Sequence, residues 1–202
     1  INKSDLNGYI DLADDKWKNK ILVRSSNNVY NQSLISAMII KYGEEEVKKF
    51  LKGFISNFAR KPSGGDRDQI KAVAAGEGDL ALVNSYYFLK MKSQDNEKKL
   101  DNVIEYFPND KFMQTHINIS GAGIIKNSKN KENAIKFLEF LVSDEAQKIY
   151  SEVNFEYPIR KNIELNRFMK KYDNFIKDDI NLSDLAKMNK KSIMLMDIAG
   201  WQ

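Results

Sequence analysis

The chain has 202 residues, of which 42% are hydrophobic and 30% are charged, with a formal net charge of +4 at pH 7. This composition excludes a mainly disordered chain, and no apolar run approaches the ~20 residues that a membrane-spanning helix needs. With no cysteine and a single histidine, His116, the sequence also excludes disulfides, zinc–thiolate sites and metal sites built from several histidines.

The first half of the chain alternates short apolar runs with helical patterns. Two of these runs predict buried strands, each followed by polar residues. Gly43 ends one helix, and Glu44 begins the next with negative charge where the helix dipole favours it. These signals predict, in chain order, a strand at 20–24, helices at 32–42, 44–58 and 66–75, a strand at 79–83 and a helix at 84–92.

The second half predicts two further strands and several helices. Strands are expected at 103–107 and at 116–125, the longer of which contains two glycines. An amphipathic helix is expected at 131–142, and Ser143 with the acidic residues after it begins another. Two more helices are expected at 162–172 and 182–199. Strands that alternate with helices predict an α/β fold in which helices cover a sheet.

The excess positive charge lies near the C-terminus, where residues 160–191 contain nine Lys and Arg against five Asp and Glu. A nucleic-acid-binding surface would need a basic stripe interleaved with aromatic residues, or a recognised motif. The lysines here form only a diffuse patch. We therefore expect a solvated helical surface and no nucleic acid partner.

Tyrosines follow both strands predicted in the first half. In open α/β sheets, ligands bind beyond the carboxyl ends of the strands. Tyr30 lies in the loop expected after the first strand, and Tyr86 and Tyr87 follow the second. If the two strands are parallel neighbours, the three phenols open onto one edge of the sheet.

Three phenolates would cancel the charge of Fe³⁺, a hard cation that favours such oxygen donors over imidazole or thioether. Because the unperturbed pKa of tyrosine lies near 10, ionising each one at pH 7 costs about 4 kcal/mol, and three cost roughly 12 kcal/mol. Only a strongly bound, highly charged metal offsets that cost, and its binding releases protons. The alternative is that these tyrosines are core or interface aromatics with satisfied hydroxyls.

Several motifs along nearly the whole chain occur in an order that points to one family. They lie at 9–14 with 17–18, 23–34, 57–60, 64–70, 84–87, 118–123 and 130–139. Together they resemble the ferric-iron-binding periplasmic proteins of ABC importers, also called bacterial transferrins. The resemblance implies the α/β, two-lobed type II periplasmic-binding-protein fold, whose lobes close around the ligand.

The resemblance also implies a domain organisation. Residues 1–116 would form the C-terminal lobe with the tyrosine cluster, 117–166 an incomplete return segment of the N-terminal lobe, and 167–202 helices that pack back on the C-terminal lobe. Members of the family have a longer N-terminal stretch, so we expect a C-terminal fragment of a periplasmic protein with a signal peptide upstream of Ile1. Without its lobe, the return segment would expose apolar side chains and invite dimerisation or domain swapping. Those side chains are Phe137, Leu138 and Leu141.

The twin tyrosines of the family's iron site match Tyr86 and Tyr87, and the third tyrosine of one subgroup matches Tyr30. The resemblance therefore implies that these three residues bind Fe³⁺. Members without the third tyrosine tend to complete the site with a synergistic anion. The presence of Tyr30 thus argues against an obligatory phosphate.

Asn84 and Asp66 match positions beside the site in such proteins, and Arg67 is a third candidate neighbour because a guanidinium favours phenolates. The alternatives are a loop or helix cap for Asn84 and Asp66, and an ion pair with Asp66 or Asp68 for the arginine. His116 matches the start of the family's hinge strand. We expect it to lie apart from the tyrosine loops, in a hydrogen-bonded structural role.

The resemblance implies a protein that captures Fe³⁺ and delivers it to an ABC transporter permease in the inner membrane, without catalysis. The alternative is a binding protein of the same fold for an organic or anionic solute, in which the tyrosines supply stacking and hydroxyl hydrogen bonds. An enzyme would depend on His116, and no motif places a serine or an acid to work with it.

Overall fold

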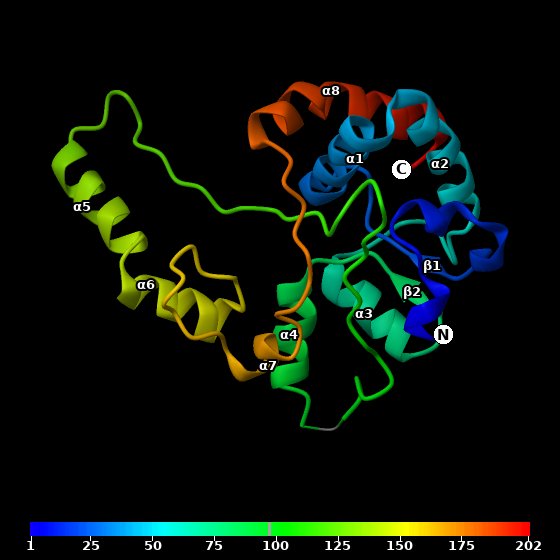
Figure 1. Cartoon of the computed structure of the whole chain (residues 1–202), viewed down its shortest axis with the longest axis horizontal. Coiled ribbons are helices and arrows are strands. Elements are labelled where there is room, and N and C mark those ends of the chain that lie inside the picture. The colour runs from blue at the N-terminus through cyan, green and yellow to red at the C-terminus, as the bar shows by residue number, and fades with distance from the viewer. Residues whose placement is uncertain (97) are drawn as a thin grey trace.

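Two short parallel strands lie inside the larger part of the molecule (Figure 1). The computed structural model describes residues 1–96 and 98–202. In it, β1 (Ile21–Leu22) pairs with β2 (Leu80–Ala81), with Ile21 opposite Leu80 and Leu22 opposite Ala81. Both predicted strands of the first half are therefore confirmed as parallel neighbours, although each is shorter than expected.

Helices make up most of the remaining regular structure, and the sheet that the sequence predicts is limited to this small parallel pair. In chain order they are η1 (Lys3–Asp5), η2 (Ile10–Ala13), η3 (Asp15–Trp17), α1 (Val29–Tyr42), α2 (Glu44–Ser56), α3 (Asp66–Ala74), α4 (Ser85–Ser93), α5 (Lys131–Leu141), α6 (Asp144–Ile149), the π-helical turn η4 (Tyr150–Asn154), α7 (Arg167–Lys170) and α8 (Leu182–Ala199).

The strands predicted at 103–107 and 116–125 are wrong. Neither segment forms a strand in the described part of the chain. Only the adjacent Thr115 makes an isolated parallel bridge, to Lys177. An apolar, β-branched run favours an extended backbone, but a strand also needs a partner beside it. Here the segment after Thr115 runs out to α5 as a single extended connection (Figure 1).

The helix predicted at 162–172 is reduced to α7. Asn166 caps it, because the side-chain oxygen of Asn166 accepts a hydrogen bond from the Phe168 amide at 3.0 Å. The Asn166 amide donates to Ser151 Oγ at 3.0 Å, and that hydroxyl donates to the Glu164 carbonyl at 3.2 Å. Ser151 thus holds the preceding residues outside the helix, a tertiary contact that the local sequence does not reveal.

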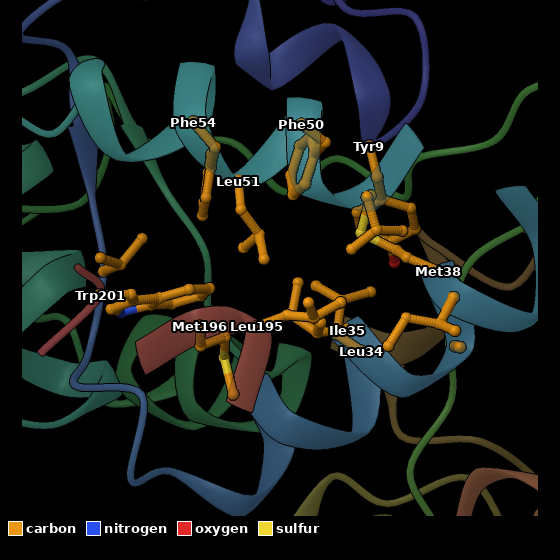
Figure 2. Packing of buried hydrophobic residues seen from close by; sticks show 14 of the residues in the cluster. Tyr9, Leu34, Ile35, Met38, Phe50, Leu51, Phe54, Leu195, Met196 and Trp201 are labelled. Atoms are coloured by element: carbon orange, nitrogen blue, oxygen red, sulfur yellow. The ribbon is translucent and has the colours of Figure 1, made fainter. Parts of the chain in front are cut away.

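The larger core forms where α1, α2 and α8 pack together. Figure 2 shows Leu51 and Phe54 of α2 facing Ile35 of α1, Leu195 of α8 and the C-terminal Trp201. The rings of Phe54 and Trp201 meet edge to face with centroids 5.4 Å apart. This packing fixes α1 and the C-terminus against each other. A smaller core lies around α3, α4 and α7, with Ile70, Phe88, Leu89, Leu100, Phe155 and Met169 buried in it.

Helices α5 and α6 stand apart from both cores in Figure 1. No residue of α5 is buried, and the Phe137 side chain is 60% exposed. Leu138 and Leu141 are half-buried. The expected apolar exposure is therefore confirmed for Phe137 and is smaller for the two leucines. Among the residues that the structure describes, every helix is too short or too polar to cross a lipid bilayer.

Glu105 is a buried carboxylate near the smaller core. Within the described part of the chain, neither of its oxygens has a hydrogen-bond partner, and the buried Tyr157 hydroxyl also has none. Burial raises the pKa of Glu105 to about 8, and the charge of Lys3 opposes this shift. The folded protein therefore favours the protonated form of this carboxyl.

We expect Glu105→Gln to stabilise the protein at alkaline pH. Because the folded-state pKa of Glu105 is raised from 4.5 to about 8, the stability of the native protein falls as pH rises from 4.5 to 8. Glutamine does not titrate, so the free energy of unfolding of the variant should exceed that of the native protein by up to about 5 kcal/mol at pH 9, with a much smaller difference at pH 4.5. Urea unfolding at both pH values measures this. An equal difference at the two pH values, or one shared by the exposed control Glu139→Gln, would contradict the burial argument.

Candidate metal centre

Tyr30, Tyr86 and Tyr87 meet at the carboxyl ends of β1 and β2. The hydroxyl oxygens of Tyr30 and Tyr86 lie 3.4 Å apart. The rings of Tyr86 and Tyr87 are 4.1 Å apart between centroids and are tilted by 32°. Since the chain leaves both parallel strands at the same edge, residues distant in the sequence come together there. The structure thus brings together the three phenols that the sequence singles out.

Tyr30 lies in the first turn of α1 rather than in a loop, because α1 begins at Val29, three residues before the predicted start. Asn28 causes the early start. Its side-chain oxygen accepts hydrogen bonds from the amides of Tyr30, at 2.8 Å, and Asn31, at 3.2 Å. The side-chain amide of Asn31 in turn donates a hydrogen bond to the Ser25 carbonyl at 3.1 Å. These bonds tie the loop after β1 to the helix that carries Tyr30.

The surroundings of Tyr86 disfavour its ionisation. Burial is the largest cause that raises the pKa of Tyr86 far above its ordinary value, followed by hydrogen bonds and charge repulsion with Tyr30 and Tyr87. Phenolates so close together need a cation between them to offset their repulsion.

Asp66 joins the loops that follow the two strands. Its side chain is almost fully buried and forms an ion pair with Arg24, which follows β1. Its other oxygen accepts hydrogen bonds from the main-chain amide of Asn84, at 2.9 Å, and from its side-chain amide, at 3.2 Å. The alternative role of Asp66 as a helix cap is wrong, because Gly65 occupies the cap position of α3.

The arginine that pairs with Asp66 is Arg24 and not Arg67. The guanidinium of Arg67 lies 5.7 Å from the centroid of the Tyr87 ring, within range of a cation–π contact. Asp68 accepts a hydrogen bond from the Gly65 amide at 2.7 Å and so closes the first turn of α3. Arg67 therefore contacts the aromatic ring of a candidate ligand.

A cavity of about 60 Å³ opens beside Tyr30. It is lined by Tyr9, Arg24, Asn28, Tyr30, Asn31, Leu34, Asp66, Leu82, Val83, Asn84, His116 and Asn118. The described residues contain no group of three or more His, Cys, Asp and Glu side chains that could hold a metal ion. Tyr30 lines this cavity, whereas Tyr86 and Tyr87 are not among its lining residues and reach the site through the contact of Tyr86 with the Tyr30 hydroxyl.

His116 does not lie apart from the tyrosines as predicted, because it lines the same cavity as Tyr30. Its predicted hydrogen-bonded role is confirmed: the ring Nε2 is 2.8 Å from Ser33 Oγ of α1. Burial lowers the pKa of His116 to about 4, so the ring is neutral at pH 7. Sequence reasoning did not single out Asn118, since only the fold of the chain brings it into the cavity.

The comparisons with known proteins agree on one kind of relative. The sequence profile of the bacterial extracellular solute-binding proteins matches residues 7–182. The chain is 41% identical to iron uptake protein A1 of Synechocystis, over 100% of this chain and 57% of that protein.

Solved structures give the same result. A Trichodesmium protein in complex with iron and citrate superposes with a TM-score of 0.93 and 48% identity, over 100% of this chain and 65% of that one. The ferric binding protein of Campylobacter jejuni superposes with a TM-score of 0.94 and 38% identity, also over 100% of this chain and 65% of that one. The chain thus matches these type II binding proteins over less than two thirds of their length.

Asp66→Asn should destabilise the protein while it preserves the shape of the site. Asparagine can still accept hydrogen bonds from Asn84, but it leaves Arg24 without its buried counter-charge. Because Arg24 is itself partly exposed, we expect a loss of about 2 kcal/mol, below the 3–5 typical of fully buried pairs. Urea unfolding at pH 7 measures the loss, with the exposed Asp15→Asn as control. Unfolding curves that match the native protein's would show that the ion pair does not contribute.

Proposed function

The chain belongs to the bacterial extracellular solute-binding proteins, and on that premise we propose that it binds ferric iron and delivers it to an ABC-type uptake transporter. This is a family of binding proteins, not of enzymes, and membership implies a permease as partner. The observation that carries the proposal is the convergence of three phenols, with the hydroxyls of Tyr30 and Tyr86 3.4 Å apart. The iron-uptake and iron-bound relatives support it.

In the proposed mechanism, Tyr30, Tyr86 and Tyr87 bind Fe³⁺ as phenolates. Three phenolate charges cancel the charge of the ion, and its field supplies the free energy that ionisation requires. Each phenol releases its proton when the metal binds. Affinity should therefore fall as pH falls, which offers a means of releasing the ion.

We propose that the protein acts in the periplasm, and that residues 117–166 contribute to a second lobe that closes over the site. The support is the separation of α5 and α6 from the two cores (Figure 1) and the exposed apolar side chains on α5. Residues 1–116 and 167–202 would then form the lobe that holds the tyrosines. Closure of the lobes would remove the bound ion from water.

The competing function is the binding of an organic or anionic solute by the same cavity. Arg24 is the one cationic side chain among the described residues that line the cavity, and it is paired with Asp66. An anion would therefore have to compete with a buried carboxylate. This pairing favours the cation over the anion.

Ferric-tyrosinate absorption tests the function directly. We expect ferric citrate, added at pH 7.5, to produce a visible absorption band that weakens on acidification, because protons compete with the metal for the phenolates. Tyr86→Phe and Tyr30→Phe should each weaken the band and lower the affinity by about 100-fold or more, beyond the roughly 10–100-fold typical of outer-shell changes.

The matched control is Tyr150→Phe, which lies in η4, away from the cavity. It should keep the native band and affinity. If both Tyr86→Phe and Tyr30→Phe retain colour and affinity, the tyrosines are not the ligands. A thermal shift with a small organic solute, but no colour with iron, would favour the competing function.

We also propose that the 202-residue chain self-associates through the apolar face of α5. Phe137, at 60% exposure, is its most exposed phenylalanine. Phe137→Asp should then convert dimer to monomer in light scattering, because it places a charge in an apolar contact. The exposed Glu139→Gln on the same helix should not. A monomeric native chain at high concentration would contradict the proposal.

A further inference from the structure

One extended segment contacts both helices that carry the tyrosines. His116 Nε2 lies 2.8 Å from the hydroxyl of Ser33, which is one turn after Tyr30 on α1. Two residues later, Asn118 Nδ2 donates to Asn84 Oδ1 at 3.1 Å, and Asn84 is the N-cap residue of α4. Side chains two apart in an extended chain leave on the same side. Both residues accordingly line the same cavity.

This segment is held in place by bonds on its other sides. The main chain of Thr115 accepts from the Asp178 amide at 2.9 Å and donates to the Ile176 carbonyl at 3.1 Å. The His116 amide donates to the buried Tyr9 hydroxyl at 3.0 Å. The segment therefore has fixed neighbours and can act as a spacer between α1 and α4.

Asn84 gives up a local bond to make this connection. An asparagine at the N-cap usually accepts from the amides of the second and third helical residues, which here are Tyr86 and Tyr87. The side chain of Asn84 makes no such cap bond. It donates to Asp66 and accepts from Asn118 instead. The position of the Tyr86–Tyr87 turn thus depends on Asn84's longer-range partners.

Beyond the Asp66 link between the loops that precede them, helices α1 and α4 have few direct bonds to each other. In the described part of the chain, the contact between the Tyr30 and Tyr86 hydroxyls is the only hydrogen bond between these two helices. That contact joins the two candidate ligands, which must reorganise when they ionise. A link that does not pass through the phenols, in addition to the one through Asp66, would keep the helices at this distance.

We propose that His116 and Asn118 are positioning residues that set the spacing between Tyr30 and the Tyr86–Tyr87 pair. His116 fixes α1 through Ser33, and Asn118 fixes α4 through Asn84. The role in iron binding rests on the proposed function, whereas the spacing of the phenols does not. In this proposal neither residue is a ligand of the ion.

The experiment measures the spacing with and without iron. Four full-chain variants are compared with the native protein. They are Asn118→Asp, His116→Ala, the double variant that combines these two changes, and the control Asn133→Ala on α5. Asn118→Asp keeps the size of the side chain and removes its hydrogen-bond donor. The metal-free readout is photo-oxidative dityrosine cross-linking between Tyr30 and Tyr86, mapped by mass spectrometry. The second readout is ferric affinity together with the wavelength of the tyrosinate band.

We expect the double variant to lose most of the Tyr30–Tyr86 cross-link, to bind iron about 10–100-fold more weakly and to shift the band, as removal of outer-shell partners does. Asn118→Asp should show the same changes to a smaller degree, and Asn133→Ala none. Circular dichroism and urea unfolding establish that each variant folds.

The possible failures are separable. If the native protein forms the band and the folded double variant keeps native cross-linking, affinity and wavelength, the positioning role is overturned while iron binding stands. If the native protein forms no band but the double variant loses the cross-link, iron binding is overturned and the spacing role stands. Loss of affinity with native cross-linking and wavelength would also overturn the positioning role, because it would mean a general loss of stability.

Discussion

The parallel pairing of β1 with β2 determines where the candidate metal centre lies. It consists of two residue pairs, Ile21 with Leu80 and Leu22 with Ala81. So short a ladder contributes few hydrogen bonds, and its position depends on packing, since Ile21 and Leu22 are both buried in the protein interior. Because the strands are parallel, the chain leaves both at the same edge. Tyr30 and Tyr86 therefore meet although 56 positions separate them.

The polar groups beside the strands give this edge a defined shape. Asp66 ties the residues after β1 to those after β2 by pairing with Arg24 and accepting two hydrogen bonds from Asn84. Trp201 Nε1 adds a bond to the Arg24 carbonyl at 2.9 Å, which links the C-terminus to the same loop. A buried ion pair is weak evidence for stability, because desolvation opposes its attraction. Its clearer effect here is geometric: the two loops have one favourable separation.

The sequence predicted the features that depend on local pattern. The apolar runs and the polar residues after each of them predicted the two strands. The meeting of the tyrosines was predicted only on the condition that the strands are parallel neighbours, and the structure meets that condition. The strands predicted at 103–107 and 116–125 failed because an extended segment becomes a strand only beside a partner. His116 and Asn118 were not placed in the cavity for a related reason. Their position depends on the path of the segment past Thr115, which tertiary contacts with residues 176–178 determine.

The same closeness that makes Tyr86 costly to ionise gives the proposed site a basis for choosing its ion. Burial and the neighbouring phenols raise the pKa of Tyr86. A divalent cation would cancel only two of three phenolate charges, leaving either an uncompensated negative charge or one neutral phenol that binds poorly. A trivalent cation cancels all three. Under the proposed function, selectivity for Fe³⁺ over divalent ions thus follows from charge balance at the site. A rigid spacing of the phenols strengthens this selectivity, because tyrosines that could separate would relieve their repulsion without the third charge.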